Sequence, residues 1–117
     1  MLFFIINPLA GRGHGLTVWK KIEEDSRTFL ESEGFRIFFT EGRGNAKAIA
    51  REITEDSQGE KKIIVIGGTG TLNEVVDGVK LDGDRVSLAF LPVCKENDFV
   101  RGLDKSYKAP MNIQKLL

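Results

Sequence analysis

Three segments of this chain combine glycine with polar side chains and come directly after apolar runs, an arrangement typical of phosphate-binding loops. They are Asn7-Pro8-Leu9-Ala10-Gly11, Gly67-Gly68-Thr69-Gly70-Thr71 and the stretch from Pro92 to Asp98. Glycine lets backbone N–H groups approach a phosphate closely, and the amino terminus of a following helix adds a favourable dipole. Each exposed helix end contributes only about 0.3–1 kcal/mol toward an anion. Several such ends must therefore converge if the segments bind phosphate.

Each glycine cluster taken alone also fits a second interpretation, in which glycine only permits a tight turn between a strand and a helix. A Walker P-loop is excluded, because no Gly-Lys-Ser/Thr follows any of the clusters. Gly11, Gly13 and Gly15 also miss the G-x-G-x-x-G spacing of dinucleotide-binding loops. For each cluster alone, both phosphate binding and turn formation stay open.

Four apolar runs predict the strands that must position these segments, namely Leu2–Ile6, Phe35–Thr40, Ile63–Ile66 and Val86–Leu91. Between them the apolar spacing predicts three helices, over about Leu16–Glu33, Asn45–Asp56 and Thr71–Val79. Asn45 is expected to cap its helix, and Gly34 to end the first one. A short helix from Asn97 or Asp98 to Arg101 and a last helix after Pro110 complete the pattern. This alternation predicts an α/β fold, a three-layer α/β/α sandwich around a central, mostly parallel sheet.

Composition places the chain among ordinary single globular domains. It has 117 residues, 41% of them hydrophobic, and its 17 Lys+Arg balance 17 Asp+Glu. The balanced charge argues against a nucleic-acid partner. The apolar run Leu2–Ile6 is far too short to span a bilayer. Cys94, the only cysteine, cannot form an internal disulfide, so we expect a cytoplasmic location.

The three segments together resemble the diacylglycerol kinase catalytic-domain family. The resemblance is carried by Asn7-Pro8-x-x-Gly11, by the run from Gly67 to Gly78, and by Pro92-x-x-x-x-Asn97-Asp98-Phe99-x-Arg101, so it covers essentially the whole chain. The most specific part is Leu72-Asn73-Glu74-Val75-Val76. The family shares its α/β nucleotide-binding domain with NAD kinases and, more distantly, with phosphofructokinases.

The resemblance implies a nucleotide site for ATP, with Mg²⁺, and a lipid acceptor of the diacylglycerol type that would bring the protein to the membrane surface. The implied nucleotide-binding residues are Asn7, Pro8, Gly11, Thr40, Gly67, Gly68, Thr69, Gly70, Thr71, Asn73, Glu74, Lys95, Asn97 and Asp98. Two of these residues also have a plainer interpretation: Thr71 as a helix N-cap and Glu74 as an acid that complements the helix dipole. No catalytic or metal-binding residue is assigned.

The chain departs from the family pattern at two of the three motifs. The family's Gly-Gly-Asp-Gly-Thr has Thr69 in place of the Asp, and a hydroxyl cannot replace a carboxylate's charge near a metal. The family's Gly-Thr-Gly-Asn-Asp has Cys94-Lys95-Glu96 before Asn97. The 117 residues are also expected to form only the nucleotide-binding domain, without the β-rich second domain that in the family carries the catalytic base, a structural metal site and much of the lipid-binding face.

The leading functional hypothesis is therefore the ATP-binding domain of a diacylglycerol-type lipid kinase, as a fragment or a degenerate copy that does not turn over alone. The alternative is a non-enzymatic nucleotide- or phosphate-binding module with the same fold. A third possibility, an NAD-kinase-like phosphotransferase, is disfavoured by the run from Leu72 to Val76. The lipid acceptor and the oligomeric state cannot be read from the sequence.

Overall fold

The structure is a computed structural model of the chain, and it describes residues 1–55, 59–79 and 85–93. Its elements follow one another in the order β1 (Leu2–Ile6), α1 (Ala10–Asp25), α2 (Arg27–Glu33), β2 (Phe35–Phe39), α3 (Asn45–Glu55), β3 (Lys61–Gly67), α4 (Thr69–Gly78) and β4 (Val86–Pro92). The predicted alternation of strands and helices is confirmed for these residues. The helices expected after Asn97 and after Pro110 lie outside the described residues.

The four strands form one parallel sheet in the order β2-β1-β3-β4. β3 contains the apolar run Ile63–Ile66 and is a central strand, with β1 on one side and β4 on the other, as the sequence predicts. Its register pairs Ile64 with Phe4 of β1 and with Ala89 of β4. Strands covered on both faces need apolar residues at successive positions, which is why β1 and β3 are unbroken apolar runs.

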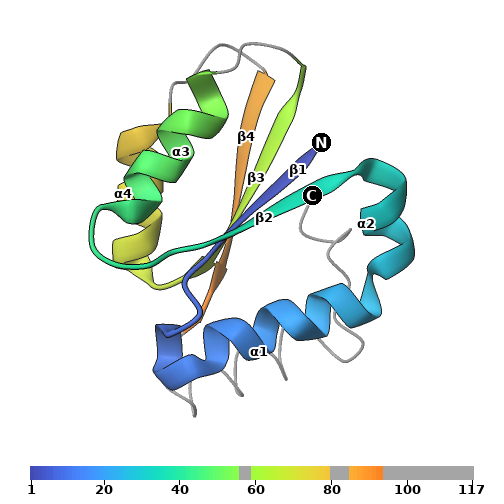
Figure 1. The fold of residues 1–117 in the computed structure, drawn as a ribbon, viewed down its shortest axis with the longest axis horizontal. Coiled ribbons are helices and arrows are strands. Elements are labelled where there is room, and N and C mark those ends of the chain that lie inside the picture. Colours follow the sequence, from blue (N-terminus) through green and yellow to red (C-terminus); the bar gives the residue numbers. More distant parts are fainter. Residues whose placement is uncertain (56–58, 80–84, 94–117) are drawn as a thin grey trace.

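Successive strand residues point to opposite faces, so β1 and β3 contribute to two separate cores. The core under α1 and α2 contains the buried residues Leu2, Phe4, Ile6, Val18, Trp19, Ile22, Leu30, Ile64, Ile66, Leu91 and Val93. The core under α3 and α4 contains Ile5, Ala46, Ala50, Ile53, Ile63, Val65 and Val75. Figure 1 shows the two pairs of helices on opposite faces of the sheet. The predicted three-layer α/β/α fold is confirmed.

The helix predicted over about Leu16–Glu33 is divided in the structure. It breaks at Ser26, whose φ of −121° and ψ of 19° are not helical. Successive residues of an unbroken helix are turned by about 100° around its axis. Phe29 would then lie on nearly the same side of the helix as Ile22, and Leu30 would be turned roughly 80° away from Ile22. The structure instead buries Leu30 at 1% exposure and leaves Phe29 only partly buried. The break therefore turns Leu30 onto the sheet. Gly34 ends α2 as predicted, with a φ of 78° and an N–H that donates to the Leu30 carbonyl.

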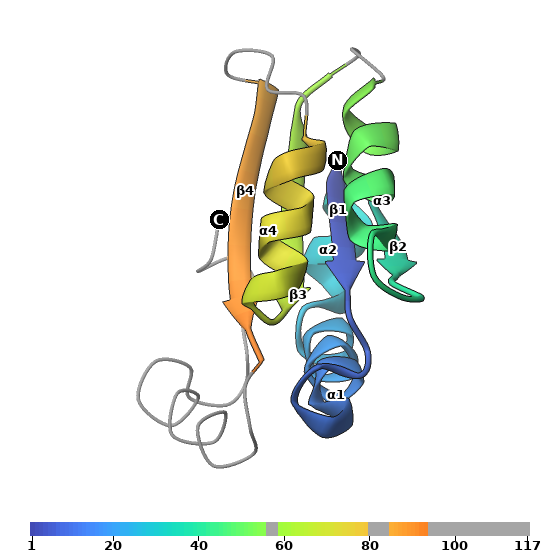
Figure 2. The same cartoon turned by 90° about the vertical axis from the view of Figure 1, so that its left-hand side faces the viewer.

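Two helices approach neighbouring backbone so closely that only glycine fits at the contact. A Cβ on Gly15 of α1 would lie 2.0 Å from the carbonyl oxygen of Asn7. A Cβ on Gly78 of α4 would lie 2.2 Å from the carbonyl oxygen of Lys47 in α3. Both neighbours are backbone atoms, which cannot move aside as the end of a flexible side chain can. Gly15 thus holds α1 against the loop after β1, and Gly78 holds α4 against α3, its neighbour in Figure 2.

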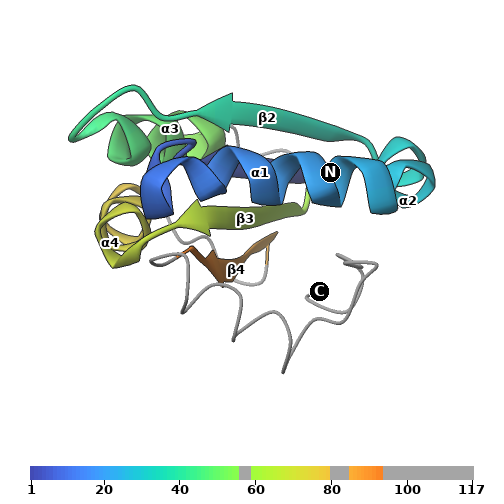
Figure 3. The ribbon, with the colours of Figure 1, turned by 90° about the horizontal axis from the view of Figure 1, so that it is seen from below.

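The chain reverses its direction across the sheet between β1 and β3. From β1 it passes through α1 and α2 to β2, and then through α3, on the other face, to β3 on the far side of β1. Seen from below, α1 lies between β2 and β3, along the middle of the sheet (Figure 3). Open parallel sheets bind ligands beyond the carboxyl ends of their strands at such a reversal. The loops after β1 and β3 flank that position here.

Candidate functional site

A cleft of about 450 Å³ lies among the loops that follow β1, β2 and β3 at their carboxyl ends. Residues predicted from the sequence that line it are Asn7, Gly11, Thr40, Gly68, Gly70, Thr71 and Glu74. The expectation that these segments meet around one crevice is confirmed. Nucleotide binding in that crevice stays a prediction.

The amino terminus of α4 forms one wall of the cleft. Gly68 precedes the helix in extended conformation, with a φ of −95° and a ψ of −177°, and no side chain caps this end. The Leu72 N–H closes the first turn by donating to the Gly68 carbonyl at 3.1 Å. The N–H groups before Leu72 have no partner within the helix, as at any helix start. Because Gly68, Gly70 and Thr71 line the cleft, this polar end of α4 borders it.

Asn7 joins the loop after β1 to the start of α4. Its Oδ1 accepts a hydrogen bond from the Leu9 N–H at 3.1 Å, and its Nδ2 donates to Thr71 Oγ1 at 3.5 Å. Its own backbone N–H donates to the Ile66 carbonyl of β3 at 2.8 Å. Thr71 lies inside α4 and does not cap it, which excludes the plainer interpretation of that residue. The two loops are therefore held together across the reversal point of the sheet.

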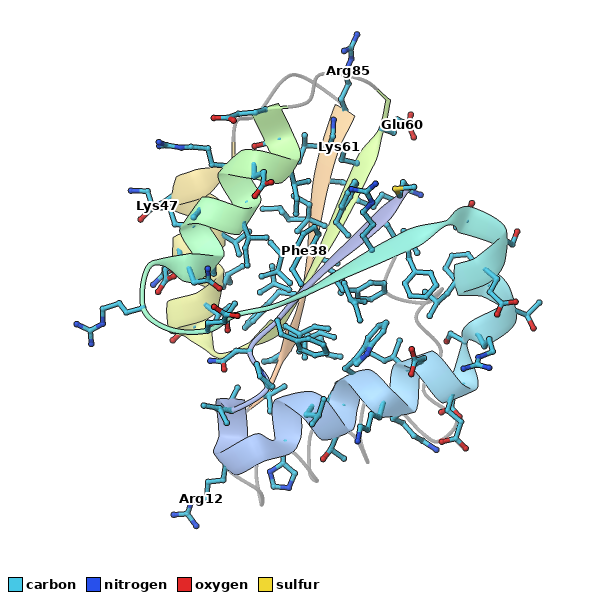
Figure 4. All side chains as sticks on the ribbon, in the orientation of Figure 1. Arg12, Phe38, Lys47, Glu60, Lys61 and Arg85 are labelled. Carbon is cyan, nitrogen blue, oxygen red and sulfur yellow. The ribbon has the colours of Figure 1, made fainter. Side chains whose placement is uncertain are left out.

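The loop after β1 turns through three left-handed residues. The sequence predicts a loop as far as Gly15, whereas α1 begins at Ala10 and contains a non-helical kink at Gly11, Arg12 and Gly13. Arg12, with a φ of 61°, is the only described residue other than glycine with a positive φ. Such a conformation costs a side-chain-bearing residue roughly 1–2 kcal/mol. The Arg12 side chain points out from the start of α1 in Figure 4 and does not line the cleft.

The loop between β2 and α3 forms the third wall. The Thr40 N–H donates to the Ile6 carbonyl at 2.8 Å and extends the pairing of β1 with β2. Asn45 does not cap α3 through its side chain as predicted, because its Oδ1 accepts from the Glu41 N–H at 2.9 Å and so folds back on the loop. Glu74 is not in the first turn of α4, and its Oε1 accepts from the Gly44 N–H at 3.0 Å. Glu74 therefore tethers this loop to α4, which corrects its interpretation as a dipole-compensating acid.

Several predicted site residues do not line the cleft. Gly67 is buried at the end of β3, where a Cβ would lie 3.0 Å from Thr71 Oγ1, so this glycine serves packing. Asn73 is exposed, because it is turned about 100° along α4 from its neighbour Glu74. Thr69 is exposed, and Pro8 is half-buried beside the cleft residues Asn7 and Leu9. Lys95, Asn97 and Asp98 lie outside the described residues.

Leu9 and Ala10, inside the predicted segment from Asn7 to Gly11, line the cleft as well. Other residues line it without having been predicted, namely Glu41, Gly42, Arg43, Ala46 and Val93. Arg43 is the only cation among the described residues that line it. The available signal was position alone, since Glu41, Gly42 and Arg43 directly follow Thr40 at the carboxyl end of a strand. An exposed Glu-Gly-Arg turn looks the same in a sequence whether or not it borders a site.

The glycines at the start of α4 distinguish a ligand cradle from a mere turn. A Cβ on Gly68 or on Gly70 would meet no atom within 4 Å, and neither glycine has a positive φ. The described fold would therefore accept a side chain at both positions, and that side chain would occupy the edge of the cleft. The two glycines therefore leave open space beside the first N–H groups of α4, and a phosphate would fit there.

The described residues offer little for a metal ion. Within residues 1–55, 59–79 and 85–93 no three His, Cys, Asp or Glu residues gather where they could hold one. The carboxylates lining the cleft are those of Glu41 and Glu74, and Glu74 already accepts the Gly44 N–H. In the same ranges no helix has the length and apolar character needed to cross a bilayer.

Comparison with known proteins agrees with this geometry. The family model described as "Diacylglycerol kinase catalytic domain" matches residues 1–117. The Bacillus subtilis protein named "Putative lipid kinase YtlR" is 46% identical over 101 residues, which cover 86% of this chain and 32% of that protein. A diacylglycerol kinase of Staphylococcus saprophyticus is 36% identical over 101 residues, covering 85% of this chain and 31% of that one.

A solved structure of a diacylglycerol kinase from Bacillus anthracis superimposes with a TM-score of 0.64 and 30% sequence identity. It covers 91% of this chain and 38% of that one. The chain thus spans about a third of the length of the relatives it matches. Motifs, parallel sheet, cleft and family match agree, and the chain belongs to the diacylglycerol kinase catalytic domain family.

Proposed function

We propose that the cleft binds the phosphates of ATP and that the chain is the nucleotide-binding part of a diacylglycerol-type lipid kinase. The observation that carries the proposal is the free space at Gly68 and Gly70, beside the first N–H groups of α4, which have no partner within the helix. Neither backbone conformation nor packing requires glycine there. A ligand that approaches the backbone closely is a reason for both glycines to be present.

In this proposal the phosphates lie against the first turn of α4, where N–H groups and the helix dipole favour negative charge. Arg43 on the opposite loop contributes a guanidinium that can bind phosphate oxygens in a fork. Asn7 and Glu74 act indirectly, because each joins two of the three loops around the ligand. The residues Lys95, Asn97 and Asp98 are proposed to complete the site.

Magnesium bound to ATP neutralises charge on the phosphates during phosphoryl transfer. The donors described here do not form a magnesium site of their own, because one of the two cleft carboxylates already holds the Gly44 N–H. We propose that the ion enters bound to the nucleotide. Transfer to a lipid is proposed to need groups beyond these 117 residues, since the relatives are about three times as long.

Calorimetric titration with ATP and magnesium tests the nucleotide proposal through Gly70→Ala. The new methyl group narrows the phosphate cradle, so we expect ATP affinity to fall about tenfold or more, equivalent to about 1.4 kcal/mol. The fold should not suffer, because alanine favours a helix over glycine by about 0.5–1 kcal/mol. Asp77→Ala, on an exposed position of the same helix, is the matched control and should bind ATP like the unmodified chain. Equal ATP affinities for Gly70→Ala and Asp77→Ala would exclude the proposed cradle.

A non-enzymatic binding module is the second candidate, and Thr69 is the observation that favours it. The family motif has a carboxylate at this position, whereas Thr69 is an exposed hydroxyl at the first residue of α4. The full reading frame that contains this chain separates the two candidates in a mixed-micelle assay with radiolabelled ATP and diacylglycerol. Turnover supports the kinase, and ATP binding without turnover supports the module.

A further inference from the structure

A second pocket, of about 570 Å³, lies at the opposite end of the sheet from the cleft. We call it the amino-end pocket, and its lining residues are Met1, Phe3, Arg36, Phe38, Glu52, Ile53, Gly59, Glu60 and Lys61. They come from the amino-terminal parts of β1 and β3, from Arg36 and Phe38 of β2, from the last turns of α3 and from the residues just before β1 and β3. Figure 4 shows Glu60 and Lys61 at the far end of the molecule from Arg12, which marks the cleft end. The pocket shares no lining residue with the cleft.

Strand register explains why aromatic rings and a cation meet in this pocket. Phe3 of β1 pairs with Arg36 of β2, and Ile5 pairs with Phe38, so these four residues share one face of the sheet. That face is the one covered by α3, and both Phe3 and Phe38 pack against the core beneath that helix. The two rings are only partly buried, and they form an apolar floor beside Ile53 of α3.

Arg36 gives the pocket a polar side. Within residues 1–55, 59–79 and 85–93 it makes no ion pair, and it is an exposed residue that lines the pocket with Phe3 and Phe38. A guanidinium next to aromatic rings can bind a carboxylate in a fork while it stacks on a flat ligand. Lys61 also lines the pocket, but it is only 5% exposed and already makes an interaction, so Arg36 is the exposed basic side chain among the described lining residues. Glu52 and Glu60 line the pocket too and would repel an anion with more than one negative charge. A ligand with a single carboxylate fits this charge distribution best.

We propose that the amino-end pocket binds a small aromatic monocarboxylate. Its ring lies on Phe3 and Phe38, and its carboxylate accepts hydrogen bonds from Arg36. The volume lies in the range of about 300–1,000 Å³ that small-molecule sites usually have. The proposal is independent of nucleotide binding, because it concerns the other end of the same strands.

Nuclear magnetic resonance titration of the ¹⁵N-labelled 117-residue chain with 1-naphthoate tests the proposal. We expect saturable shifts of the Phe3, Arg36, Phe38 and Ile53 amides, and none at Gly68–Thr71. Arg36→Gln should raise the dissociation constant about tenfold, since it removes a charged hydrogen-bond donor. Arg51→Gln, an exposed substitution on α3 outside the pocket, is the matched control and should have no effect. The neutral 1-naphthamide should bind the unmodified chain as weakly as 1-naphthoate binds Arg36→Gln.

Two further measurements keep the test decisive. Phe38→Leu retains an apolar side chain but removes the ring, so it should weaken binding while the amide spectrum stays that of a folded protein. Addition of ATP should not displace 1-naphthoate. Two results would leave Arg36 only the role of a charge that protects an edge strand from aggregation. One is that no saturable shift occurs, and the other is that Arg36→Gln and Arg51→Gln bind 1-naphthoate with the same dissociation constant. Either of these results, or competition by ATP, overturns the proposal.

Discussion

The two glycine-containing loops that border the cleft look alike in the sequence and differ in what the glycines do. Where the loop after β1 enters α1, Gly11 and Gly13 have left-handed backbone, and Gly15 lies against the Asn7 carbonyl. In the loop after β3, Gly68 and Gly70 have ordinary backbone and empty space around them. The fold itself accounts for glycine in the first loop. In the second loop it leaves Gly68 and Gly70 unexplained, and the proposed phosphate site would account for them.

A glycine cluster can have two different reasons, the needs of the fold or the needs of a ligand, and a sequence alone does not distinguish them. A glycine required by backbone conformation or packing stabilises the protein, so its substitution should affect folding. A glycine required by a ligand should affect binding and leave folding intact. The predictions that follow test this separation, from the largest expected effect to the smallest.

Gly15→Ala should be the most damaging substitution. The new Cβ would lie 2.0 Å from the Asn7 carbonyl oxygen, so either α1 or the loop after β1 must move. Overpacking against backbone costs about 3 kcal/mol. Urea denaturation followed by circular dichroism measures the loss. An unchanged midpoint would mean that Gly15 is not a packing glycine, and the contrast between the loops would fail.

Asn7→Ala should have the next largest effect. It removes the acceptor of the Leu9 N–H within the loop after β1 and the donor to Thr71, which joins this loop to α4. Each such hydrogen bond contributes about 0.5–1.5 kcal/mol, so we expect a loss near 2 kcal/mol. Asn7→Asp is the informative partner, because it keeps the acceptor and removes the donor. If Asn7→Asp is as unstable as Asn7→Ala, the Leu9 contact contributes nothing.

Glu74→Ala should destabilise the chain by about 1 kcal/mol, because it releases the Gly44 N–H and with it the loop between β2 and α3. Glu74→Gln retains an oxygen acceptor and should recover most of the loss. Thermal unfolding of the two variants in parallel gives the comparison. Equal melting temperatures for both would show that the tether is not formed in solution.

Thr69→Asp should have the smallest effect on folding and a distinctive effect on binding. A carboxylate at the first residue of α4 complements the helix dipole and stabilises the chain by about 0.3–1 kcal/mol. It restores the family motif, so we expect ATP to bind more tightly with magnesium and more weakly without it. Calorimetry with and without magnesium measures both affinities. Equal changes under both conditions would show that the position has no connection to the metal.

The sequence was sufficient to predict the layers of the fold, because apolar runs such as Ile63–Ile66 carry their own evidence of burial on two faces. It was also sufficient to bring Asn7, Gly68 and Thr71 to one crevice, since carboxyl ends of parallel strands share an edge. It missed features that depend on tertiary contacts. The break at Ser26 follows from the way Leu30 packs on the sheet, which no local pattern reveals.

The roles of single polar residues were harder still to predict. Asn45 and Glu74 are good capping and dipole residues by type, yet each one binds a backbone N–H of the loop after β2. Gly67 and Gly68 are adjacent and identical in type, and only the atoms around them separate packing from open space. Residue type restricts what a position can do, and the neighbours in space decide which of these roles it has.

The most direct test of the central claim is a nuclear magnetic resonance titration of the chain with ATP and magnesium. The account predicts that the largest amide shifts occur at Gly68, Thr69, Gly70 and Thr71, where a phosphate would meet the N–H groups of α4. Smaller shifts should occur in the loop after β1, whose glycines serve the fold. Shifts that are absent from Gly68–Thr71, or that are largest elsewhere in the chain, would contradict the assignment of the second loop to phosphate.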